Sequence, residues 1–218
     1  MSRDWDDRAD ELAAEAISAG EPTAWFDRLY TEGASGAVSM PWDRSEPQPV
    51  LRDWALEAKL SGEGRRAVVV GCGLGADAEF LASLGFSTVA FDVAPTAVEV
   101  ARERHPSSGV DFRVADLLDL PAEWSGTFDL VVEIFTIQAL PDPPRGDAVS
   151  AVRRLVAPGG TLLVEAFRTD EEADATSGPP FALSRDRLQS FVADGFEAVE
   201  IAAVEGGLWR AQFESSRC

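Results

Sequence analysis

Short apolar runs and segments with helically spaced apolar residues alternate along the chain from residue 67 onward. Apolar runs rich in β-branched residues are typical of buried strands, whereas apolar residues three and four positions apart predict helices. The predicted strands are Ala67–Val70, Ser87–Phe91, Val110–Val114, Phe128–Val132 and Thr161–Phe167. The predicted helices are Ala76–Leu84, Pro95–Arg104 and Arg145–Val156, with a weaker turn at Pro121–Trp124. This alternation predicts an α/β, doubly wound fold with a mostly parallel sheet and right-handed crossovers.

The pattern changes toward the end of the chain. Ser184–Ala193 has helical spacing, with Ser184 as its N-cap. Gly195–Val204 and Leu208–Phe213 read as strands, and only the short segment Glu205-Gly206-Gly207 separates them. Such a link predicts an antiparallel hairpin, because a parallel crossover needs a dozen or more residues. We therefore expect a seven-stranded sheet whose last strand is antiparallel.

The N-terminal region is organised differently. Its predicted elements are helices over Asp4–Ala19, Thr23–Thr31 and Pro49–Leu60 and a loop over 33–47. Within this loop, Pro41-Trp42-Asp43 places a large aromatic residue among turn formers. We expect two units, which are a helical cap with a lid loop over 1–62 and an α/β domain over 63–218.

Composition and charge exclude several classes of protein. The 218 residues carry a formal net charge of −19, and nucleic-acid binding needs clustered Lys and Arg, so we expect no nucleic-acid partner. No apolar run reaches the roughly 18 residues of a membrane span, and the first 20 residues do not read as a secretion signal. We expect a cytoplasmic protein with no membrane partner, as a monomer or homodimer.

The cysteines and the single histidine limit the chemistry further. Cys72 lies in a glycine-rich turn and Cys218 ends the sequence, so no disulfide framework is predicted. His105 has no paired cysteines to complete a zinc site, and we predict no metal. As a residue that follows a surface helix, His105 is expected to lie in solvent.

A glycine-rich turn joins the first predicted strand to the next helix. Its sequence is Gly71-Cys72-Gly73-Leu74-Gly75, and glycines let the backbone approach a ligand closely and adopt positive φ. Asp92 ends the second strand, where a carboxylate can accept hydrogen bonds from both ribose hydroxyls. Asp116 ends the third strand and can accept from an adenine amino group, beside the Leu117 amide. These residues predict a crevice for a nucleoside cofactor.

The glycine turn alone leaves two cofactors open. Gly71-x-Gly73-x-x-Ala76, with Asp92 about 20 residues on, satisfies the dinucleotide pattern and would fit a nicotinamide-dependent oxidoreductase. Gly71-x-Gly73-x-Gly75 equally suits an S-adenosylmethionine site.

The segments that follow separate the two, because residues 65–167 resemble the class I S-adenosylmethionine-dependent methyltransferases. The matching segments are VVVGCGLG, AFDV, RVADLLDL, FDLVVE and LVAPGGTLLVE. The closing hairpin is similar to that family's reversed last strand. The resemblance implies a Rossmann-like methyltransferase fold, S-adenosyl-L-methionine as cofactor and a small molecule as methyl acceptor.

The same resemblance assigns the site. The glycines would lie under the methionine moiety, Asp92 would bind the ribose and Asp116 the adenine, and Glu133 would line the methyl-transfer cleft. Asp77 would meet the cofactor's ammonium group or stabilise the helix dipole. The implied cofactor-binding residues are Trp42, Gly71, Cys72, Gly73, Gly75, Asp77, Asp92, Val93, Asp116, Leu117 and Glu133.

The N-terminal region resembles the thiopurine, thiol and halide methyltransferases and their tellurite-resistance relatives. The similar segments are Trp25–Tyr30, Pro41-Trp42-Asp43 and Pro47-x-Pro49-x-Leu51. The resemblance implies that Trp42, and less directly Trp25, help to close the pocket. Residues 134–140, IFTIQAL, lack the aromatic-rich stretch of the halide enzymes, which leaves the acceptor open.

The expected chemistry is an in-line displacement, which needs a general base only when the acceptor holds its proton. Since no histidine is expected in the site, the leading hypothesis is a soft nucleophile such as a thiol, sulfide, thiocyanate or halide. The alternative is a hydroxyl, amine or carbon acceptor. Tyr30, Asp43 and Glu133 are possible bases for an oxygen or nitrogen acceptor, and Glu133 and Tyr30 are the candidate catalytic residues.

Overall fold

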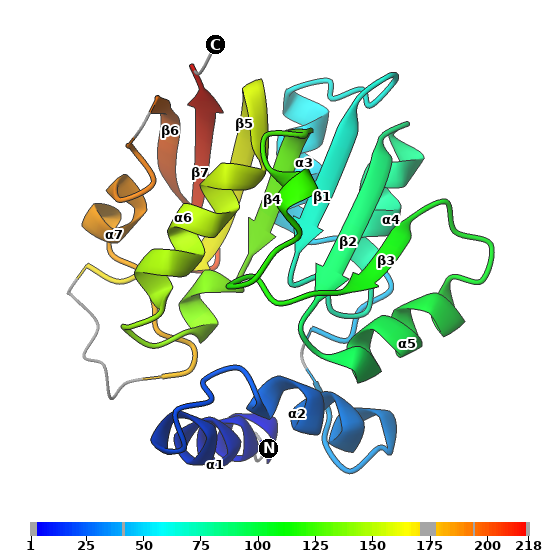
Figure 1. The fold of residues 1–218 in the computed structure, drawn as a ribbon, viewed down its shortest axis with the longest axis vertical. Coiled ribbons are helices and arrows are strands. Elements are labelled where there is room, and N and C mark those ends of the chain that lie inside the picture. Colours follow the sequence, from blue (N-terminus) through cyan, green and yellow to red (C-terminus); the bar gives the residue numbers. More distant parts are fainter. Residues whose placement is uncertain (1–3, 41, 171–177, 194, 217–218) are drawn as a thin grey trace.

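The computed structural model describes residues 4–40, 42–170, 178–193 and 195–216. Its seven strands form one sheet in the order β3-β2-β1-β4-β5-β7-β6 (Figure 1). The strands are β1 (Arg66–Val70), β2 (Ser87–Asp92), β3 (Asp111–Val114), β4 (Phe128–Ile134), β5 (Val156–Phe167), β6 (Phe196–Val204) and β7 (Leu208–Ser215). The first five run parallel, and β7 is antiparallel to both of its neighbours. The predicted fold class is confirmed.

The helices follow the predicted order, with ends that differ by a few residues. They are α1 (Asp4–Ser18), α2 (Trp25–Ala34), α3 (Pro49–Glu57), α4 (Ala76–Ser83), α5 (Pro95–Arg104), α6 (Arg145–Leu155) and α7 (Arg185–Gln189), with 3-10 turns η1 (Ala122–Trp124) and η2 (Ile137–Ala139). The Ser184 hydroxyl accepts from the Arg187 amide at 3.3 Å, as an N-cap does. The helix predicted to reach Ala193 ends at Gln189, because residues 190–192 form tighter turns.

Strand β5 also begins earlier than predicted. The sequence predicts a helix through Val156 and a strand from Thr161, whereas β5 starts at Val156 directly after α6. The pairing of β5 with β4 shifts register between Phe128 and Leu130. The irregular segment Ala157–Gly160 therefore belongs to the strand, although its Pro and Gly are typical of a turn.

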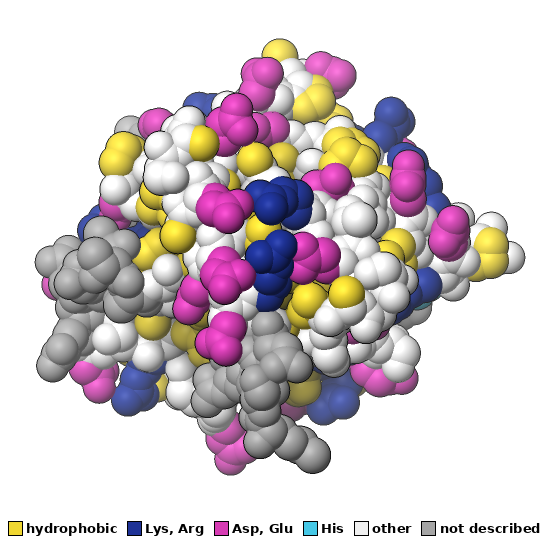
Figure 2. Space-filling view, turned by 90° about the horizontal axis from the view of Figure 1, so that it is seen from below, with side chains coloured by type: hydrophobic (Ala, Val, Ile, Leu, Met, Phe, Trp, Pro, Cys, Tyr) yellow, Lys and Arg dark blue, Asp and Glu magenta, His cyan; other side chains and the backbone are white. Residues whose placement is uncertain are grey.

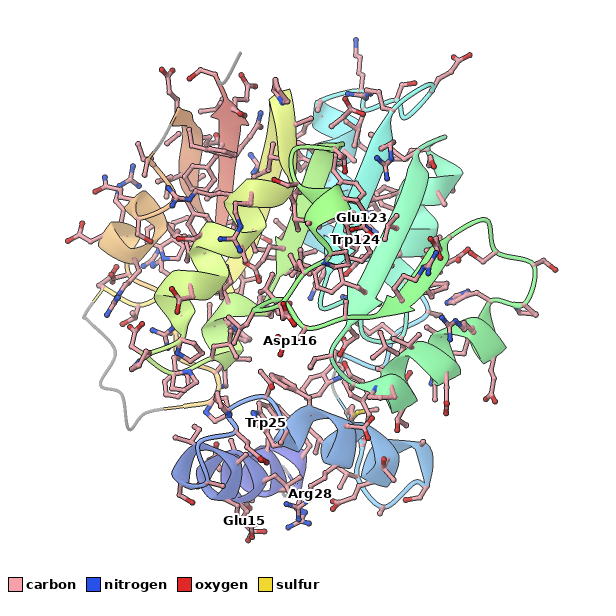
Figure 3. The ribbon with its side chains drawn as sticks, in the orientation of Figure 1. Glu15, Trp25, Arg28, Asp116, Glu123 and Trp124 are labelled. Atoms are coloured by element: carbon pink, nitrogen blue, oxygen red, sulfur yellow. The ribbon has the colours of Figure 1, made fainter. Side chains whose placement is uncertain are left out.

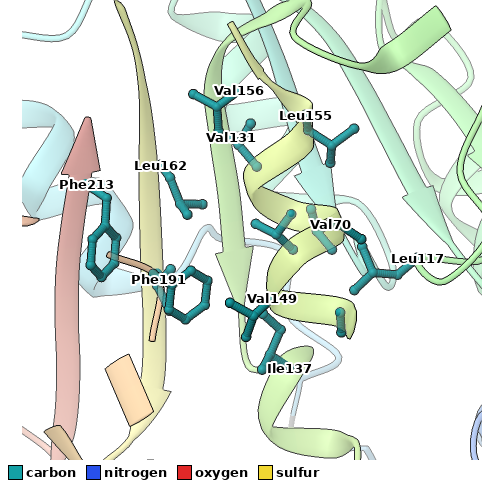
Figure 4. Close-up of a cluster of buried hydrophobic side chains, with 14 of the residues drawn as sticks. Val70, Leu117, Val131, Ile137, Val149, Leu155, Val156, Leu162, Phe191 and Phe213 are labelled. Carbon is teal, nitrogen blue, oxygen red and sulfur yellow. The ribbon is translucent and has the colours of Figure 1, made fainter. Parts of the chain in front are cut away.

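Residues of the central strands face the two sides of the sheet in turn. Val70 and Val131 pack with Leu155 and other residues of α6 on one side (Figure 4), and Val68 belongs to the same cluster. Ala67, Val69 and Val132 pack with α3, α4 and α5 on the other side. Because both sides are covered, these strands need apolar residues at successive positions. This explains the continuous run at the start of the predicted domain.

Helices α1 and α2 form a cap below the carboxyl ends of the parallel strands (Figure 1). Leu12, Trp25 and Leu29 form the cap's buried cluster. The cap is joined to α5, because the Thr96 amide donates to the Asp27 carboxylate at 2.8 Å. Helix α3 packs on the sheet instead. The division of the chain at residue 62 stays a prediction.

The outer face of the cap is charged. Figure 2 looks onto this face and shows basic side chains with acidic ones around them. Ion pairs join Arg8 to Glu32 at 2.7 Å and Arg28 to Glu15 at 3.0 Å. Figure 3 shows Glu15 and Arg28 on the outside of the cap and Trp25 on the side toward the sheet. The cap therefore directs its apolar side at the strand ends.

The described residues also bear on membrane spans, metal ligands and the cysteines. No helix in the described ranges is long and apolar enough to cross a bilayer. The described residues contain no group of three or more His, Cys, Asp or Glu that could hold a metal ion. Cys72 is a buried free thiol, whereas Cys218 and Pro41 lie outside the described residues.

Leu155 provides a test of the core between α6 and the sheet, since its side chain is 1% exposed. Leu155→Ala should lower the free energy of unfolding by roughly 2–5 kcal/mol, through lost burial and the cavity left behind. Urea denaturation measures this change. Val199→Ala, at a position 53% exposed in β6, is the control and should change stability by less than about 0.5 kcal/mol.

Candidate active site

The turn between β1 and α4 has backbone conformations that favour glycine. Gly71, Gly73 and Gly75 have φ angles of +59°, +50° and +92°. At Gly73 a Cβ atom would lie 2.9 Å from the hydroxyl oxygen of Tyr30, in the cap. The turn therefore approaches the cap too closely for a side chain at this position.

Asp92 connects this turn to the end of β2. Its side chain is 6% exposed, and its two carboxylate oxygens accept from the Gly73 and Ala94 amides, both at 2.9 Å. Burial raises the pKa of Asp92 to about 6, although these hydrogen bonds oppose the rise. A carboxylate has about four acceptor sites, so Asp92 can still accept from further donors.

The glycine turn, the strand ends and the cap enclose a cavity of about 490 Å³, within the usual range for small-molecule sites. Of the predicted cofactor-binding residues, all except Glu133 line it. Those that line it are Trp42, Gly71, Cys72, Gly73, Gly75, Asp77, Asp92, Val93, Asp116 and Leu117. Trp25 and Tyr30 line it too, as do Trp5, Phe26, Arg44, Gln48, Phe135, Phe167 and Leu208.

Asp116 lies in the space between the sheet and the cap, as Figure 3 shows. One of its carboxylate oxygens accepts from the Leu118 amide at 2.8 Å, which fixes the side chain in the turn after β3. Asp92 and Asp116 follow neighbouring parallel strands. The sequence placed both at the carboxyl edge correctly, because parallel strands all end there.

Aromatic side chains form the cap's side of the cavity. The ring of Trp42 lies 5.5 Å from Trp5 and 6.4 Å from Tyr30, centroid to centroid, in edge-on arrangements. Trp25 is buried and stacks on Phe26 at 4.0 Å. Burial, with the nearby Asp92 carboxylate, raises the pKa of Tyr30 well above its ordinary value. Tyr30 is thus suited to donate a proton in a hydrogen bond rather than to accept one as a base.

Glu133 has a different position from the one its strand suggests. One carboxylate oxygen accepts from the Thr136 and Ile137 amides, at 2.7 and 2.9 Å, and the side chain is 1% exposed. Burial raises its pKa to about 7. These contacts hold the turn that follows β4. A role for Glu133 in the cofactor site or in catalysis stays a prediction.

Asp77 anchors the loop that follows the cap. Its carboxylate accepts from the backbone amide of Gln48 at 2.7 Å. The side-chain carbonyl oxygen of Gln48 accepts from the Arg44 guanidinium at 2.9 Å. Burial raises the pKa of Asp77, and the positive charge of Arg44 opposes the rise. Arg44 and Asp77 therefore place opposite charges close together on the cavity wall.

Sequence reasoning missed Glu165 of β5. Its side chain is 1% exposed, and neither carboxylate oxygen has a hydrogen-bond partner among the described residues. Burial, and then the charge of Asp77, raise its pKa to about 8. The signal was an acid inside the apolar run LLVEAF, where a strand covered on both sides should have none.

His105 also differs from expectation. Its ring is half-buried and stacks on Phe112 at 6.3 Å, and its Nε2 lies 3.3 Å from the Leu74 carbonyl oxygen. His105 supports the glycine turn from behind and does not line the cavity.

The sequence of this domain is similar to a known protein family. Residues 67–160 match the family model described as a methyltransferase domain, and the sheet order and reversed last strand agree with that fold. This segment is similar to methyltransferase domains. The match begins in β1 and ends in β5, so it includes the glycine turn, Asp92 and Asp116.

Curated relatives of the methyltransferase domain include the ubiquinone biosynthesis O-methyltransferase of Xanthomonas oryzae pv. oryzae (strain PXO99A). It is 37% identical over 143 residues, which are 62% of this chain and 59% of the relative. The enzyme of the same name from Xanthomonas axonopodis pv. citri (strain 306) is 36% identical over the same shares. The chain thus spans about three fifths of the length of these relatives.

Solved structures extend the similarity of fold. One, described as "Conversion of a Disulfide Bond into a Thioacetal Group during Echinomycin Biosynthesis", has a TM-score of 0.73 and 25% identity, covering 88% of this chain and 91% of that one. The N-methyltransferase NodS from Bradyrhizobium japonicum WM9, in complex with S-adenosyl-L-homocysteine, has a TM-score of 0.66 and 20% identity, covering 86% and 97%. Both share the methyltransferase fold with this chain.

The buried acids predict how stability depends on pH. The raised pKa values of Asp92, Glu133 and Glu165 mean that the folded state holds protons that the unfolded chain releases. The contribution of these three groups to the free energy of unfolding should therefore be fully present near pH 4.5 and fall as the pH rises to about 8. Urea denaturation across this range measures the fall.

Glu165→Gln should remove part of this dependence and stabilise the protein at pH 8.5, by on the order of 2 kcal/mol. The matched control is Glu197→Gln at an exposed position of β6, which should follow the wild-type curve. A wild-type stability that rises between pH 5.5 and 8.5 would contradict the prediction.

Proposed function

We propose that this protein transfers a methyl group from S-adenosyl-L-methionine to a small molecule. The observation that carries the proposal is that the glycine turn, Asp92 and Asp116 meet around one cavity. Asp92 keeps acceptor sites for ribose hydroxyls, and Asp116 with the Leu117 amide would bind adenine. Arg44 and Asp77 suit the carboxylate and ammonium of an amino-acid moiety. The match of residues 67–160 to methyltransferases favours this cofactor over a nicotinamide.

The chain's own residues would hold the cofactor and the acceptor in line and exclude water from them. When bound, S-adenosylmethionine would supply an electrophilic methyl group to an acceptor heteroatom in line with the C–S bond. The electron pair of that bond would return to sulfur, and the proton of a hydroxyl or thiol acceptor would be released to solvent. Holding two reactants in line can be worth an effective concentration of roughly 10⁵ M or more. The rings of Tyr30 and Trp42 would exclude water and face a positive charge favourably.

The charge of the cavity bears on the acceptor. Its charged lining residues, within the described part of the chain, are Arg44, Asp77, Asp92 and Asp116. This excess of negative charge disfavours halide, thiocyanate and sulfide ions as acceptors. We therefore propose a neutral acceptor, and the curated relatives, which are named as O-methyltransferases, support a hydroxyl group.

A thiol is the second candidate acceptor. The structural neighbour described by the conversion of a disulfide into a thioacetal concerns sulfur chemistry. A thiol ionises more readily than a hydroxyl, which suits a cavity whose described lining has no histidine. The resemblance of the cap to thiol methyltransferases supports the same candidate.

Calorimetry with S-adenosylhomocysteine tests the cofactor site. Wild-type protein should bind it and should not bind NADH. Asp92→Ala should weaken binding about 10- to 100-fold, the scale of a lost hydrogen bond to a charged group. Asp119→Ala is the matched control, because Asp119 is exposed and does not line the cavity. Equal affinity in the two variants would place the ribose elsewhere.

The same measurement at several pH values tests the protonation of Asp92. Ribose hydroxyls donate to the ionised carboxylate, and the pKa of Asp92 is about 6. Affinity for S-adenosylhomocysteine should therefore fall roughly tenfold from pH 7 to pH 5. Asp92→Ala should lose this dependence, whereas Asp119→Ala should keep it.

A further inference from the structure

The residue after β4 has an unusual backbone conformation. Phe135 has φ +62°, in a region that glycine adopts easily and other residues seldom do. The conformation is held on both sides, since the Phe135 amide donates to the Glu165 carbonyl at 3.0 Å and Glu133 accepts from the next two amides. Strained conformations that are held by their surroundings concentrate at functional sites.

This conformation places the Phe135 ring against that of Phe167, at the end of β5. The two rings are nearly parallel, with 5.0 Å between centroids and 12° between planes. Both line the cavity, and Phe167 is 41% exposed. Leu208 pairs with Phe167 across β5 and β7 and lines the cavity beside it. We call the two rings of Phe135 and Phe167, together with Leu208 beside them, the aromatic wall.

The aromatic wall lies on the opposite side of the glycine turn from the nucleoside residues. In the sheet order, β2 and β3 flank β1 on one side, and β4, β5 and β7 follow on the other. Asp92 and Asp116 belong to the first side and the aromatic wall to the second. Thr136 joins the second side to the turn, because its hydroxyl donates to the Val70 carbonyl at 3.1 Å.

On the second side, the described residues that line the cavity carry no charge. The cavity-lining residues at the ends of β4 and β5, in and next to η2, at the start of β7 and in the turn before it, and in the segment before α7 are Ile134, Phe135, Thr136, Gln138, Ala139, Leu140, Phe167, Pro179, Pro180, Gly206 and Leu208. The Gln138 side chain accepts from the Phe167 amide at 2.6 Å and so fixes the wall. A charged ligand would lose its hydration here and gain no partner from these residues.

The geometry points to a methyl acceptor with a flat, uncharged hydrocarbon body that packs on the aromatic wall. This inference rests on the proposed function and narrows its acceptor class. An aromatic ring bearing a hydroxyl or thiol group would cover the exposed face of Phe167 and direct its heteroatom toward the glycine turn. Small hydrophilic acceptors would leave the wall uncovered.

The test uses 2-naphthol as a probe, with binding measured by calorimetry in the presence and absence of S-adenosylhomocysteine. Phe135→Gly removes one ring and should fold, because glycine takes φ +62° without strain. Lys59→Gly is the matched control, since exposed Lys59 also has positive φ and does not line the cavity. Phe167→Ala removes the second ring by an independent change.

We expect Phe135→Gly and Phe167→Ala to weaken 2-naphthol binding at least tenfold and to change S-adenosylhomocysteine affinity less than twofold. Lys59→Gly should leave both affinities unchanged. Wild-type protein should also methylate 2-naphthol or 2-naphthalenethiol with a higher kcat/KM than 2-mercaptoethanol or sulfide.

Two results would overturn the inference. One is 2-naphthol binding that is absent from wild-type protein or unchanged in both wall variants. The other is turnover of sulfide or 2-mercaptoethanol in preference to both naphthalene compounds. The proposed function fails separately, if wild-type protein does not bind S-adenosylhomocysteine. In that case, 2-naphthol binding that is lost in both wall variants would still support an apolar ligand site.

Discussion

The hydrogen bond from the Gly73 amide to the buried Asp92 carboxylate is the contact on which the site depends. It joins the turn after β1 to the end of β2, and the Ala94 amide holds the other carboxylate oxygen. A buried carboxylate needs such donors, because its charge has left water. The cost of burial appears in the raised pKa. The Asp92 carboxylate therefore lies at the cavity with acceptor sites that further hydrogen-bond donors can use.

The sequence predicted the sheet well because the central strands are covered on both sides and read as apolar runs. It also placed Asp92 and Asp116 at one edge, since parallel strands end together. It could not predict the early start of β5, where Pro158 and Gly159 imitate a turn. Nor could it predict Phe135, because no local pattern indicates a non-glycine residue at positive φ. Such a conformation follows from tertiary contacts with Glu133 and β5.

The sheet order divides the cavity by chemistry. Asp92 ends β2 and Asp116 lies just after β3, and both suit hydroxyl and amino donors. Phe135 follows β4 and Phe167 ends β5, and both present aromatic rings. The glycine turn lies between the two sides because β1 is central in the sheet. The carboxyl edge of the sheet can therefore hold a polar ligand and an apolar ligand next to each other. The cap lies over this edge (Figure 1).

The contact between Gly73 and Tyr30 links the cap to the innermost part of the domain. A side chain at position 73 would meet the Tyr30 hydroxyl before it met any other described neighbour. Two constraints therefore disfavour a side chain at position 73: its φ of +50° and the Tyr30 hydroxyl, from a helix more than forty residues earlier in the chain. An alanine there would strain the backbone of the glycine turn and displace the Tyr30 ring at the same time, so a single substitution would disturb both sides of the cavity.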